Sequence, residues 1–219
     1  MKIIVLGTSG YSQMLKDYIS DSEIEVVAYT VDSQFITSSE IDGVPVIPLE
    51  DLDNMYVSSE IQLALGIGYT KLGNLKKDIY NRCKAMGFQF YNYVHPSVII
   101  DKTVDMGEGN VLFENVVIQK HAKIGSGNLF FSNVAIMHDN HIGNFTTFCA
   151  CSVSNGFVHV DDCCFIGANA TIRDGVTIKS NTLIGAGTYV NHSTEENTAV
   201  LPAKSYYQSG GGISLSEKL

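Results

Sequence analysis

The sequence predicts an α/β N-terminal unit with a small, Rossmann-like parallel sheet, followed by a parallel β-helix. Two observations carry this prediction. The first 93 residues alternate β-branched runs, glycine turns and helical spacing, which is the order of a parallel sheet with crossover helices. From residue 94 a hexapeptide period begins, which is typical of a parallel β-helix. We expect an α/β unit over 1–93, a β-helix over 94–192, and a closing segment with a tail over 193–219.

The N-terminal unit begins with an apolar, β-branched run at Lys2–Leu6, and a glycine turn follows it. Apolar residues at helical spacing predict a helix over 11–20. Further apolar runs predict strands over 24–30 and 61–65. A second amphipathic helix is expected over 71–86 because apolar residues recur there at steps of three and four.

The glycine turn is the first candidate binding site. Gly7, Ser9 and Gly10 precede a predicted helix, and backbone N–H groups at a helix N-terminus can receive a phosphate or another polar group. Ser12 stands where a third glycine would complete a dinucleotide-binding motif, so a tight turn without a ligand is the alternative. Asp32, at the end of the second strand, is either a contact to a ribose or sugar or a solvated loop acid.

The hexapeptide period is the strongest pattern in the chain. Every sixth residue from 94 to 190 is apolar in sixteen of seventeen cases, and Ser154 is the exception. Small residues such as Ala122 and Ala170 recur four positions later. One large and one small residue per hexapeptide fit a triangular coil in which each hexapeptide forms one side. Glycines also recur at intervals of eighteen residues, the length of one coil.

Composition excludes several classes of protein. The formal net charge is −9, with 7 basic and 12 acidic residues up to position 93 and 7 basic and 11 acidic residues after it. The two parts therefore carry −5 and −4, so neither is suited to nucleic acid. No apolar run reaches the ~18 residues of a membrane span. Five cysteines without a disulfide pattern predict a reducing, cytoplasmic compartment.

His138 and Asp139 are the candidate catalytic pair. Asp139 is the single charged residue between positions 124 and 160, and a carboxylate beside an imidazole holds its tautomer and raises its basicity. Adjacent side chains of a strand point to opposite faces, so this pair needs a corner to cooperate. Gly156 follows one coil later and is expected beside His138, where its N–H can stabilise an oxyanion. A polar histidine satisfied at an interface is the alternative.

Four motifs carry a resemblance to a known family: Gly7-Thr8-Ser9-Gly10, Tyr93-Val94-His95-Pro96-Ser97, Ile136-Met137-His138-Asp139-Asn140-His141-Ile142-Gly143 and Pro202-Ala203-Lys204. With the repeat, residues 1–204 resemble the hexapeptide-repeat sugar acyltransferases of the sialic acid O-acetyltransferase and UDP-bacillosamine N-acetyltransferase type. The resemblance implies a left-handed β-helix, a homotrimer, acetyl-CoA as co-substrate and a nucleotide-linked sugar. It also implies His138 as general base, an acid at Asp139 and the Gly156 amide on the thioester carbonyl.

The resemblance assigns further site residues. It implies that Tyr11 and His95 lie near the nucleotide sugar with the glycine turn, although a junction cap is the alternative for His95. It implies six positions along acetyl-CoA: Thr147, Gly156, Ala168, Arg173, Ala186 and Lys204. Solvated charges are the alternative for Arg173 and Lys204. The chain departs from the family at Tyr11 and Thr147, which each replace a histidine, and at Met137, which replaces an acid.

Two more histidines follow the coil length. His141 and His159 are eighteen residues apart, so we expect them to stack. They serve either as contacts to substrate or metal, or as exposed packing. No Cys-x-x-Cys pair occurs, and we therefore predict no metal site.

The patterns, read with the resemblance to the sugar acyltransferases, predict an acetyl-CoA-dependent N-acetyltransferase. Its acceptor is expected to be the amino group of a nucleotide-linked amino-deoxy sugar, with direct transfer and no covalent enzyme intermediate. A sugar O-acetyltransferase of the sialic-acid type is the nearest alternative. A trimeric β-helix zinc hydratase and a non-catalytic scaffold are the alternatives from other classes. The nearly uncharged stretch over 124–160 fits packing against other subunits in a homotrimer.

Overall fold

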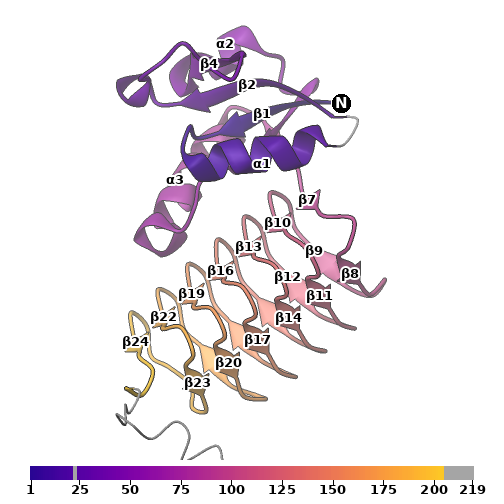
Figure 1. Cartoon of the computed structure of the whole chain (residues 1–219), viewed down its shortest axis with the longest axis vertical. Helices are drawn as coiled ribbons and strands as arrows, with labels where there is room; N and C mark the ends of the chain where they lie inside the picture. The colour runs from indigo at the N-terminus through magenta and orange to yellow at the C-terminus, as the bar shows by residue number, and fades with distance from the viewer. Residues whose placement is uncertain (22–23, 205–219) are drawn as a thin grey trace, which may run out of the picture.

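The computed structural model describes residues 1–21 and 24–204 and contains both expected units (Figure 1). An α/β unit is followed by a left-handed parallel β-helix, which confirms the predicted fold class. The expected tail lies largely outside the described residues, since 205–219 are not among them. No helix in the described part of the chain is long and apolar enough to cross a membrane.

The N-terminal unit is built on a six-stranded sheet in the order β3-β4-β2-β1-β5-β6. Neighbouring strands are parallel except β3 and β4. The strands are β1 (Lys2–Leu6), β2 (Glu25–Val31), β3 (Glu40–Ile41), β4 (Val44–Pro48), β5 (Ile61–Ala64) and β6 (Gln89–Phe90). The helices are α1 (Gly10–Ser20), α2 (Leu52–Met55) and α3 (Asn74–Ala85), with short 3-10 turns η1 (Ser33–Phe35), η2 (Leu49–Asp51) and η3 (Thr70–Gly73). The three predicted strands are confirmed to within one residue.

The first helix begins at Gly10, one residue earlier than expected, because Ser9 caps it. The Ser9 side chain accepts from the N–H of Ser12, and the Ser12 hydroxyl accepts from the N–H of Ser9 at 3.0 Å. The Ser12 hydroxyl also donates to the Gly66 carbonyl at 2.8 Å. The serine at the third glycine position therefore connects α1 to the loop after β5.

The second helix corrects the prediction for 71–86, because α3 begins at Asn74. Lys71 and Leu72 have φ values of 52° and 54°, and Gly73 has φ 89°. At Gly73 a Cβ would lie 2.2 Å from the carbonyl oxygen of Phe145 in the β-helix. Apolar spacing contains no sign of this close approach, which fixes where the helix starts.

Three two-residue strands form each coil of the β-helix and build three faces. Face 1 holds β7 (Tyr93–Val94), β10 (Val111–Leu112), β13 (Leu129–Phe130), β16 (Thr147–Phe148), β19 (Phe165–Ile166), β22 (Leu183–Ile184) and β24 (Ala199–Val200). Face 2 holds β8 (Ile99–Ile100), β11 (Val117–Ile118), β14 (Ala135–Ile136), β17 (Val153–Ser154), β20 (Thr171–Ile172) and β23 (Tyr189–Val190). Face 3 holds β9 (Asp105–Met106), β12 (Lys123–Ile124), β15 (His141–Ile142), β18 (His159–Val160) and β21 (Thr177–Ile178).

The hexapeptide frame is confirmed strand by strand. Each frame residue is the second residue of its strand, and from β7 to β23 strands on one face pair at an offset of eighteen residues. The frame side chains from Leu112 to Val190, apart from the polar Ser154, belong to one buried hydrophobic core. The small positions, such as Ala122 and Ala170, are fully buried in the same core. Burial of these apolar side chains makes the largest favourable contribution to the folding free energy of the β-helix.

The two ends of the β-helix depart from the simple frame. The first coil strand begins at Tyr93, which pairs with Val111 and so lies one residue before the expected boundary. At the other end Leu183 pairs with Ala199, an offset of sixteen residues. The expected closing segment therefore adds one more strand, β24, after the frame has shifted.

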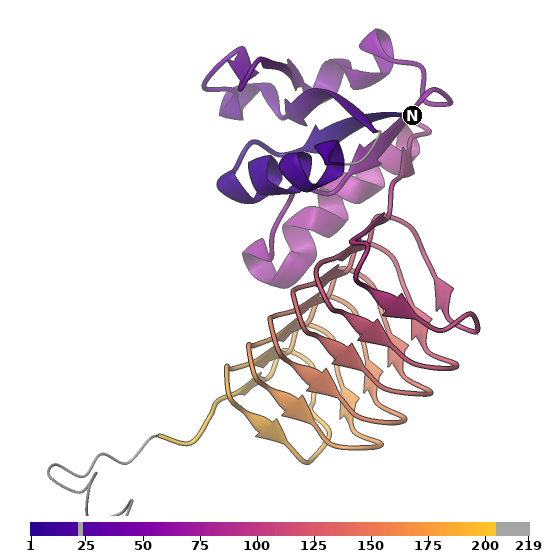
Figure 2. The ribbon, with the colours of Figure 1, turned by 45° about the vertical axis from the view of Figure 1, so that its right-hand side comes forward.

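The N-terminal unit lies over face 1 (Figures 1 and 2), from the first coils as far as Asn181, which Asn74 of α3 contacts by a side-chain hydrogen bond of 2.9 Å. Aromatic rings fill this junction, and Tyr18 contacts Phe113 with ring centroids 5.1 Å apart. Val111 and Leu129, which point outward from face 1, belong to the same buried cluster as the sheet residues. Face 1 is thus covered by the chain itself, and faces 2 and 3 are left open.

Candidate functional site

His138 and Asp139 lie in the turn that follows β14, so the expected corner exists. Asp139 has φ 56°, and this left-handed residue turns its side chain back toward its neighbour. The Nδ1 of His138 and the Oδ2 of Asp139 are 2.9 Å apart. In the neutral ring Nδ1–H donates to the carboxylate, which leaves the lone pair on Nε2. About half of the His138 side chain is exposed, so Nε2 is accessible.

Gly156 lies directly beside the His138 ring, as the coil length predicts. A Cβ at Gly156 would lie 2.7 Å from Cε1 and 2.9 Å from Nε2 of His138. Only glycine therefore leaves the ring in its place. The Phe157 ring, which is exposed, meets the His138 ring edge-on with centroids 5.1 Å apart. The basic nitrogen of His138 is thus held between a bare backbone and an apolar wall.

The backbone N–H of Gly156 has a partner that the sequence analysis missed. It donates to Oδ1 of Asp174 at 3.0 Å, so the donor expected for an oxyanion is occupied by a carboxylate in this structure. Asp174 lies eighteen residues after Gly156, and extending the coil register by one more step would have found it. Asp174 is exposed, so its side chain can leave the amide without opening the core.

On the sequence-based prediction that His138 is a general base, replacement of Gly156 by alanine is expected to lower kcat about 10- to 100-fold, because the new methyl group displaces the His138 ring by about 1 Å. Steady-state kinetics on the folded variant measure this. Combining Gly156→Ala with His138→Asn should cost little more than His138→Asn alone, since both changes act on one group. Full additivity of the two losses would contradict this.

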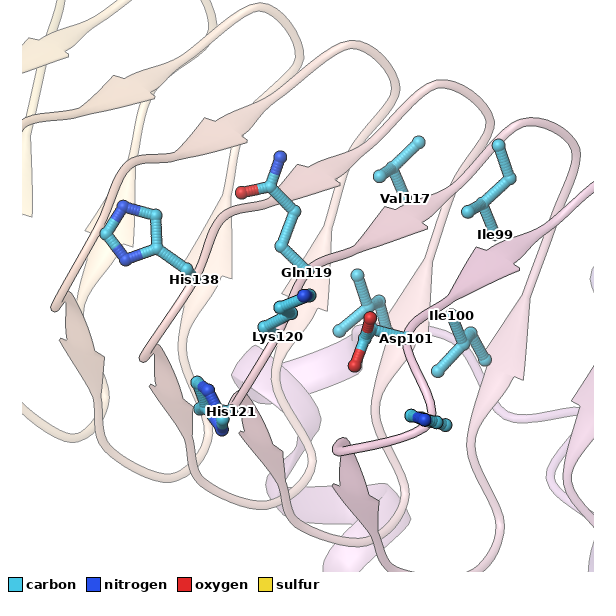
Figure 3. A pocket seen from close by; sticks show the side chains of 10 residues that line it. Ile99, Ile100, Asp101, Val117, Gln119, Lys120, His121 and His138 are labelled. Carbon is cyan, nitrogen blue, oxygen red and sulfur yellow. The ribbon is translucent and has the colours of Figure 1, made fainter.

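His138 stands at one end of a groove of about 870 Å³ on the outer side of face 2. Figure 3 shows Gln119 next to His138, with Val117 and Ile99 further along the same row. Asp101, Lys102, Lys120 and His121 also line the groove. Its floor is apolar and its rim is polar, and such a surface accepts a ligand with both kinds of group.

A second pocket, of about 260 Å³, lies in the N-terminal unit at the carboxyl ends of the parallel strands. Gly7, Ser9 and Asp32 line it together with Gly66 and Gly68. In an open parallel sheet this edge is where ligands bind. The structure therefore brings three of the sequence-predicted residues to one pocket, whereas Gly10 starts α1 outside its lining.

Asp32 lies in this pocket but is paired within the chain. Arg82 of α3 donates to both of its carboxylate oxygens, at 2.6 and 3.1 Å. This bidentate ion pair raises the pKa of Arg82. The sequence analysis did not identify Arg82, because fifty residues separate the partners. A ligand at this pocket therefore meets an Asp–Arg pair rather than a free carboxylate.

Tyr11 and His95 lie away from this pocket. The Tyr11 ring packs against Phe113 and Phe131 of the β-helix, and burial raises the pKa of its hydroxyl. His95 Nδ1 lies 2.8 Å from the Ser97 hydroxyl. Within one chain both side chains belong to the junction of the two units, which is the alternative given for His95, and their place near a nucleotide sugar stays a prediction.

Thr147 also departs from its expected place along acetyl-CoA. It lies on face 1 with 1% exposure, between its strand partners Leu129 and Phe165. The N-terminal unit covers both neighbours, since Leu129 joins the sheet cluster and Tyr69 contacts Phe165. Thr147 is therefore buried on a different face from the His138 turn and is not open to a ligand.

Gly156 is buried with its N–H bound to Asp174, whereas Ala168, Arg173, Ala186 and Lys204 are at least partly exposed. Ala168 and Ala186 lie one coil apart at the corner after face 1, and neither backbone N–H donates to another group within the described residues. Gly167 keeps this corner narrow, because a Cβ there would lie 2.5 Å from the Ala186 nitrogen. Arg173 and Lys204 are both exposed.

His141 and His159 form the expected stack on face 3, with ring centroids 4.6 Å apart. His159 Nε2 lies 2.8 Å from Asp161 Oδ1. Burial, then the neighbouring His159 and Lys123, lower the pKa of His141 below its ordinary value of 6.5. Among the described residues, no group of three or more His, Cys, Asp or Glu side chains is placed to hold a metal ion.

The His141 pKa gives a pH prediction with a defined sign. The unfolded chain binds the proton more tightly, so His141 contributes stability above pH 6.5 and loses it as the pH falls toward the lowered pKa. NMR titration should show His141 titrating below its ordinary range, and His159→Ala should raise its pKa. A pKa that does not respond to this substitution would show that the stacked pair is uncoupled.

The fold and these sites define a class, the hexapeptide-repeat proteins that carry an α/β unit before the coil. Residues 2–82 match the family model described as the PglD N-terminal domain. Residues 157–192 match the bacterial transferase hexapeptide model of six repeats. These matches confirm the resemblance that the sequence motifs indicate. No curated protein matches the chain by sequence.

Solved structures repeat the same two-unit architecture. The acetyltransferase domain of PglB from Neisseria gonorrhoeae, in complex with acetyl coenzyme A, is 20% identical with a TM-score of 0.80, and the alignment covers 93% of this chain and 98% of that one. PerB from Caulobacter crescentus, in complex with CoA and GDP-perosamine, is 22% identical with a TM-score of 0.79, and the coverages are 92% and 94%. WeeI from Acinetobacter baumannii is 20% identical with a TM-score of 0.79 and coverages of 92% and 97%. At these identities the likeness establishes the fold.

Proposed function

We propose that this protein is an acetyl-CoA-dependent N-acetyltransferase that acts on the amino group of a nucleotide-linked amino-deoxy sugar. The observation that carries the proposal is the His138–Asp139 pair, 2.9 Å apart, with its free Nε2 above the Gly156 backbone. An oriented imidazole base beside a backbone donor is what acyl transfer to an amine requires. The complexes of the PglB domain with acetyl-CoA and of PerB with CoA and GDP-perosamine support the same choice of substrates.

The proposed chemistry is direct transfer. Asp139 holds the His138 ring, and Nε2 takes a proton from the acceptor amine as its nitrogen attacks the thioester carbonyl. The C–N bond forms, the C–S bond breaks, and coenzyme A leaves as the thiolate. In the described residues no serine or cysteine is hydrogen-bonded to His138, so a covalent acyl-enzyme has no candidate nucleophile at the ring. The Gly156 N–H stabilises the oxyanion once Asp174 has moved away.

The pocket of the N-terminal unit and one corner of the β-helix divide the substrates. We assign the pocket at Gly7, Ser9 and Asp32 to the nucleotide part of the acceptor, because backbone donors at the α1 N-terminus suit a phosphate. The corner at Ala168 and Ala186 supplies two backbone N–H groups for the pantetheine arm of acetyl-CoA. Arg173 and Lys204 supply exposed positive charge for its phosphates.

A homotrimer in the cytoplasm completes the proposal. Face 2 leaves the apolar side chain of Ile99 65% exposed beside the His138 groove, and exposed apolar surface of this kind suits a neighbouring subunit. A second copy can also bring Tyr11, His95 or the acceptor pocket toward His138 of the first. The five cysteines are all free, which suits a reducing compartment.

The test is an acceptor panel. Release of free thiol from acetyl-CoA is measured with nucleotide-linked amino sugars, with the matching hydroxyl sugars, and with the free amino sugars. We expect turnover with a nucleotide-linked amine and little with the other two groups. Turnover with the hydroxyl series alone would make the protein an O-acetyltransferase, and no thiol release with any amine would refute the proposal.

Asp174 supplies a second test, because its carboxylate and the acyl oxygen compete for one N–H. Replacing Asp174 by alanine is expected to lower the KM for acetyl-CoA about 2- to 10-fold, the range of a single net hydrogen bond. The control is Asp174→Asn, which keeps an acceptor and should change KM less. A KM that rises in the alanine variant would show that Asp174 assists binding instead of competing with it.

A further inference from the structure

Two of the buried polar side chains inside the β-helix, Ser154 and Asn140, touch one another, and each interrupts a stack of apolar side chains. Ser154 is the one polar residue of the hexapeptide frame, and its strand neighbours on both sides are Ile136 and Ile172. Asn140 is the second exception, since the residues eighteen before and after it are Ala122 and Val158. Both side chains are buried, with exposures of 0% for Ser154 and 1% for Asn140. Two buried polar groups, each between apolar neighbours in its own column, need a reason.

Their hydrogen bonds lead to the catalytic turns. The Ser154 hydroxyl donates to the side-chain oxygen of Asn140. The Asn140 amide nitrogen donates to the carbonyl of Asn155 at 2.6 Å and to that of Met137 at 3.1 Å, and it lies 3.3 Å from the carbonyl of His138. Met137 directly precedes His138, and Asn155 directly precedes Gly156. One side chain thus binds both turns from inside the coil.

The side-chain oxygens of two other buried asparagines in the β-helix have hydrogen-bond donors of a different kind. Asn110 and Asn128 accept from the backbone N–H of the next coil, at 2.9 and 2.8 Å, so they need no polar side chain beside them. Asn140 accepts from Ser154 instead. Without Ser154 the buried Asn140 carbonyl loses its donor, and the amide is free to rotate away from the two turns.

We propose that Ser154 and Asn140 are a positioning pair that fixes the His138 turn over Gly156. This inference rests on the proposed function, because it assigns the pair to the geometry of the general base. The pair does not touch substrate. It holds two adjacent corners of the coil at one spacing, so that Nε2 stays above the Gly156 amide while His138 itself remains half exposed.

The experiment uses the double variant Ser154→Val and Asn140→Val. It makes both positions apolar, like the residues that stand eighteen positions before and after each of them. The coil prefers apolar residues here, so we expect a melting temperature equal to or above that of the wild type. We expect kcat to fall about 10- to 100-fold, the effect of misplacing a catalytic group by about 1 Å. The KM for acetyl-CoA should stay within about threefold, because the substitutions remove no group that contacts bound acetyl-CoA in the proposal. Ser154→Thr keeps the hydroxyl and should retain activity.

Two readouts separate positioning from plain stability. The pH dependence of kcat should shift in the double variant, and NMR of the His138 ring should show loss of the single Nδ1–H tautomer. Ser154→Ala is the second variant should the double substitution prevent folding. Unchanged kcat, pH profile and tautomer in a folded variant would overturn the inference. His138→Asn, assayed alongside, keeps the two proposals distinguishable, because full activity in that variant would refute the proposed function itself.

Discussion

Replacing His138 by asparagine is expected to lower kcat for acetyl transfer by about 10²- to 10⁴-fold, the usual contribution of a positioned general base. Asparagine fits the turn and can still donate to Asp139, but it cannot take the proton from the amine. The KM for acetyl-CoA should change little, because the ring is used in the transition state rather than for binding. Single-turnover kinetics at fixed pH measure the chemical step.

The matched control is His192→Asn, on an exposed histidine whose side chain, among the described residues, is hydrogen-bonded to its neighbour Asn191. It should leave kcat within about twofold, as expected of a surface substitution. If His138→Asn retains wild-type kcat while the protein turns over an amine acceptor, another group is the base. Deprotonation of the amine in solution would then have to precede binding.

Replacing Phe148 by alanine is expected to lower the free energy of unfolding by about 3–5 kcal/mol, the cost of truncating a buried phenylalanine. Phe148 is fully buried in the frame column and stacks on Phe130 of the previous coil, with centroids 5.4 Å apart and planes 15° apart. The loss removes transfer free energy and leaves a cavity that the rigid coil cannot close.

Urea unfolding at one fixed protein concentration measures this loss, since association of copies would add to the apparent stability. The control is Phe157→Ala, because Phe157 is also a phenylalanine of the β-helix but its side chain is 62% exposed. That change should alter the free energy of unfolding by about 0.5 kcal/mol or less. Equal losses at Phe148 and Phe157 would mean that the stacked column is not the source of stability.

The β-helix was predictable because every sixth residue of the repeat is an inward side chain, so the hexapeptide period locates each strand. Once the frame ends a strand at Ile136 and begins the next before Ile142, the residues between them must form a corner. The left-handed Asp139 beside His138 is therefore implied by the frame, although the period alone cannot give a φ value. The same counting placed Gly156 and, taken one step further, would have placed Asp174.

The junction of the two units could not be predicted in this way, because no repeat crosses it. The ion pair of Asp32 with Arg82, the packing of Tyr11 on Phe113 and the burial of Thr147 depend on how a sheet, a helix and one face of the coil meet in space. The start of α3 depends on the approach of Gly73 to Phe145 in the same region. The sequence motifs single out individual residues in this region, but they do not predict which residues of other elements pack against them.

The constant offset of eighteen residues has a consequence for how this sequence can vary. Deleting one residue inside a regular coil would turn every later inward side chain toward a corner or the solvent, so length changes there should be rare even where substitutions are common. The last turn differs, since Ile184 pairs with Val200 after sixteen residues and the chain after Val190 lacks the frame. Insertions and deletions should therefore gather over 191–198, while the coils that carry His138 and Gly156 keep their length.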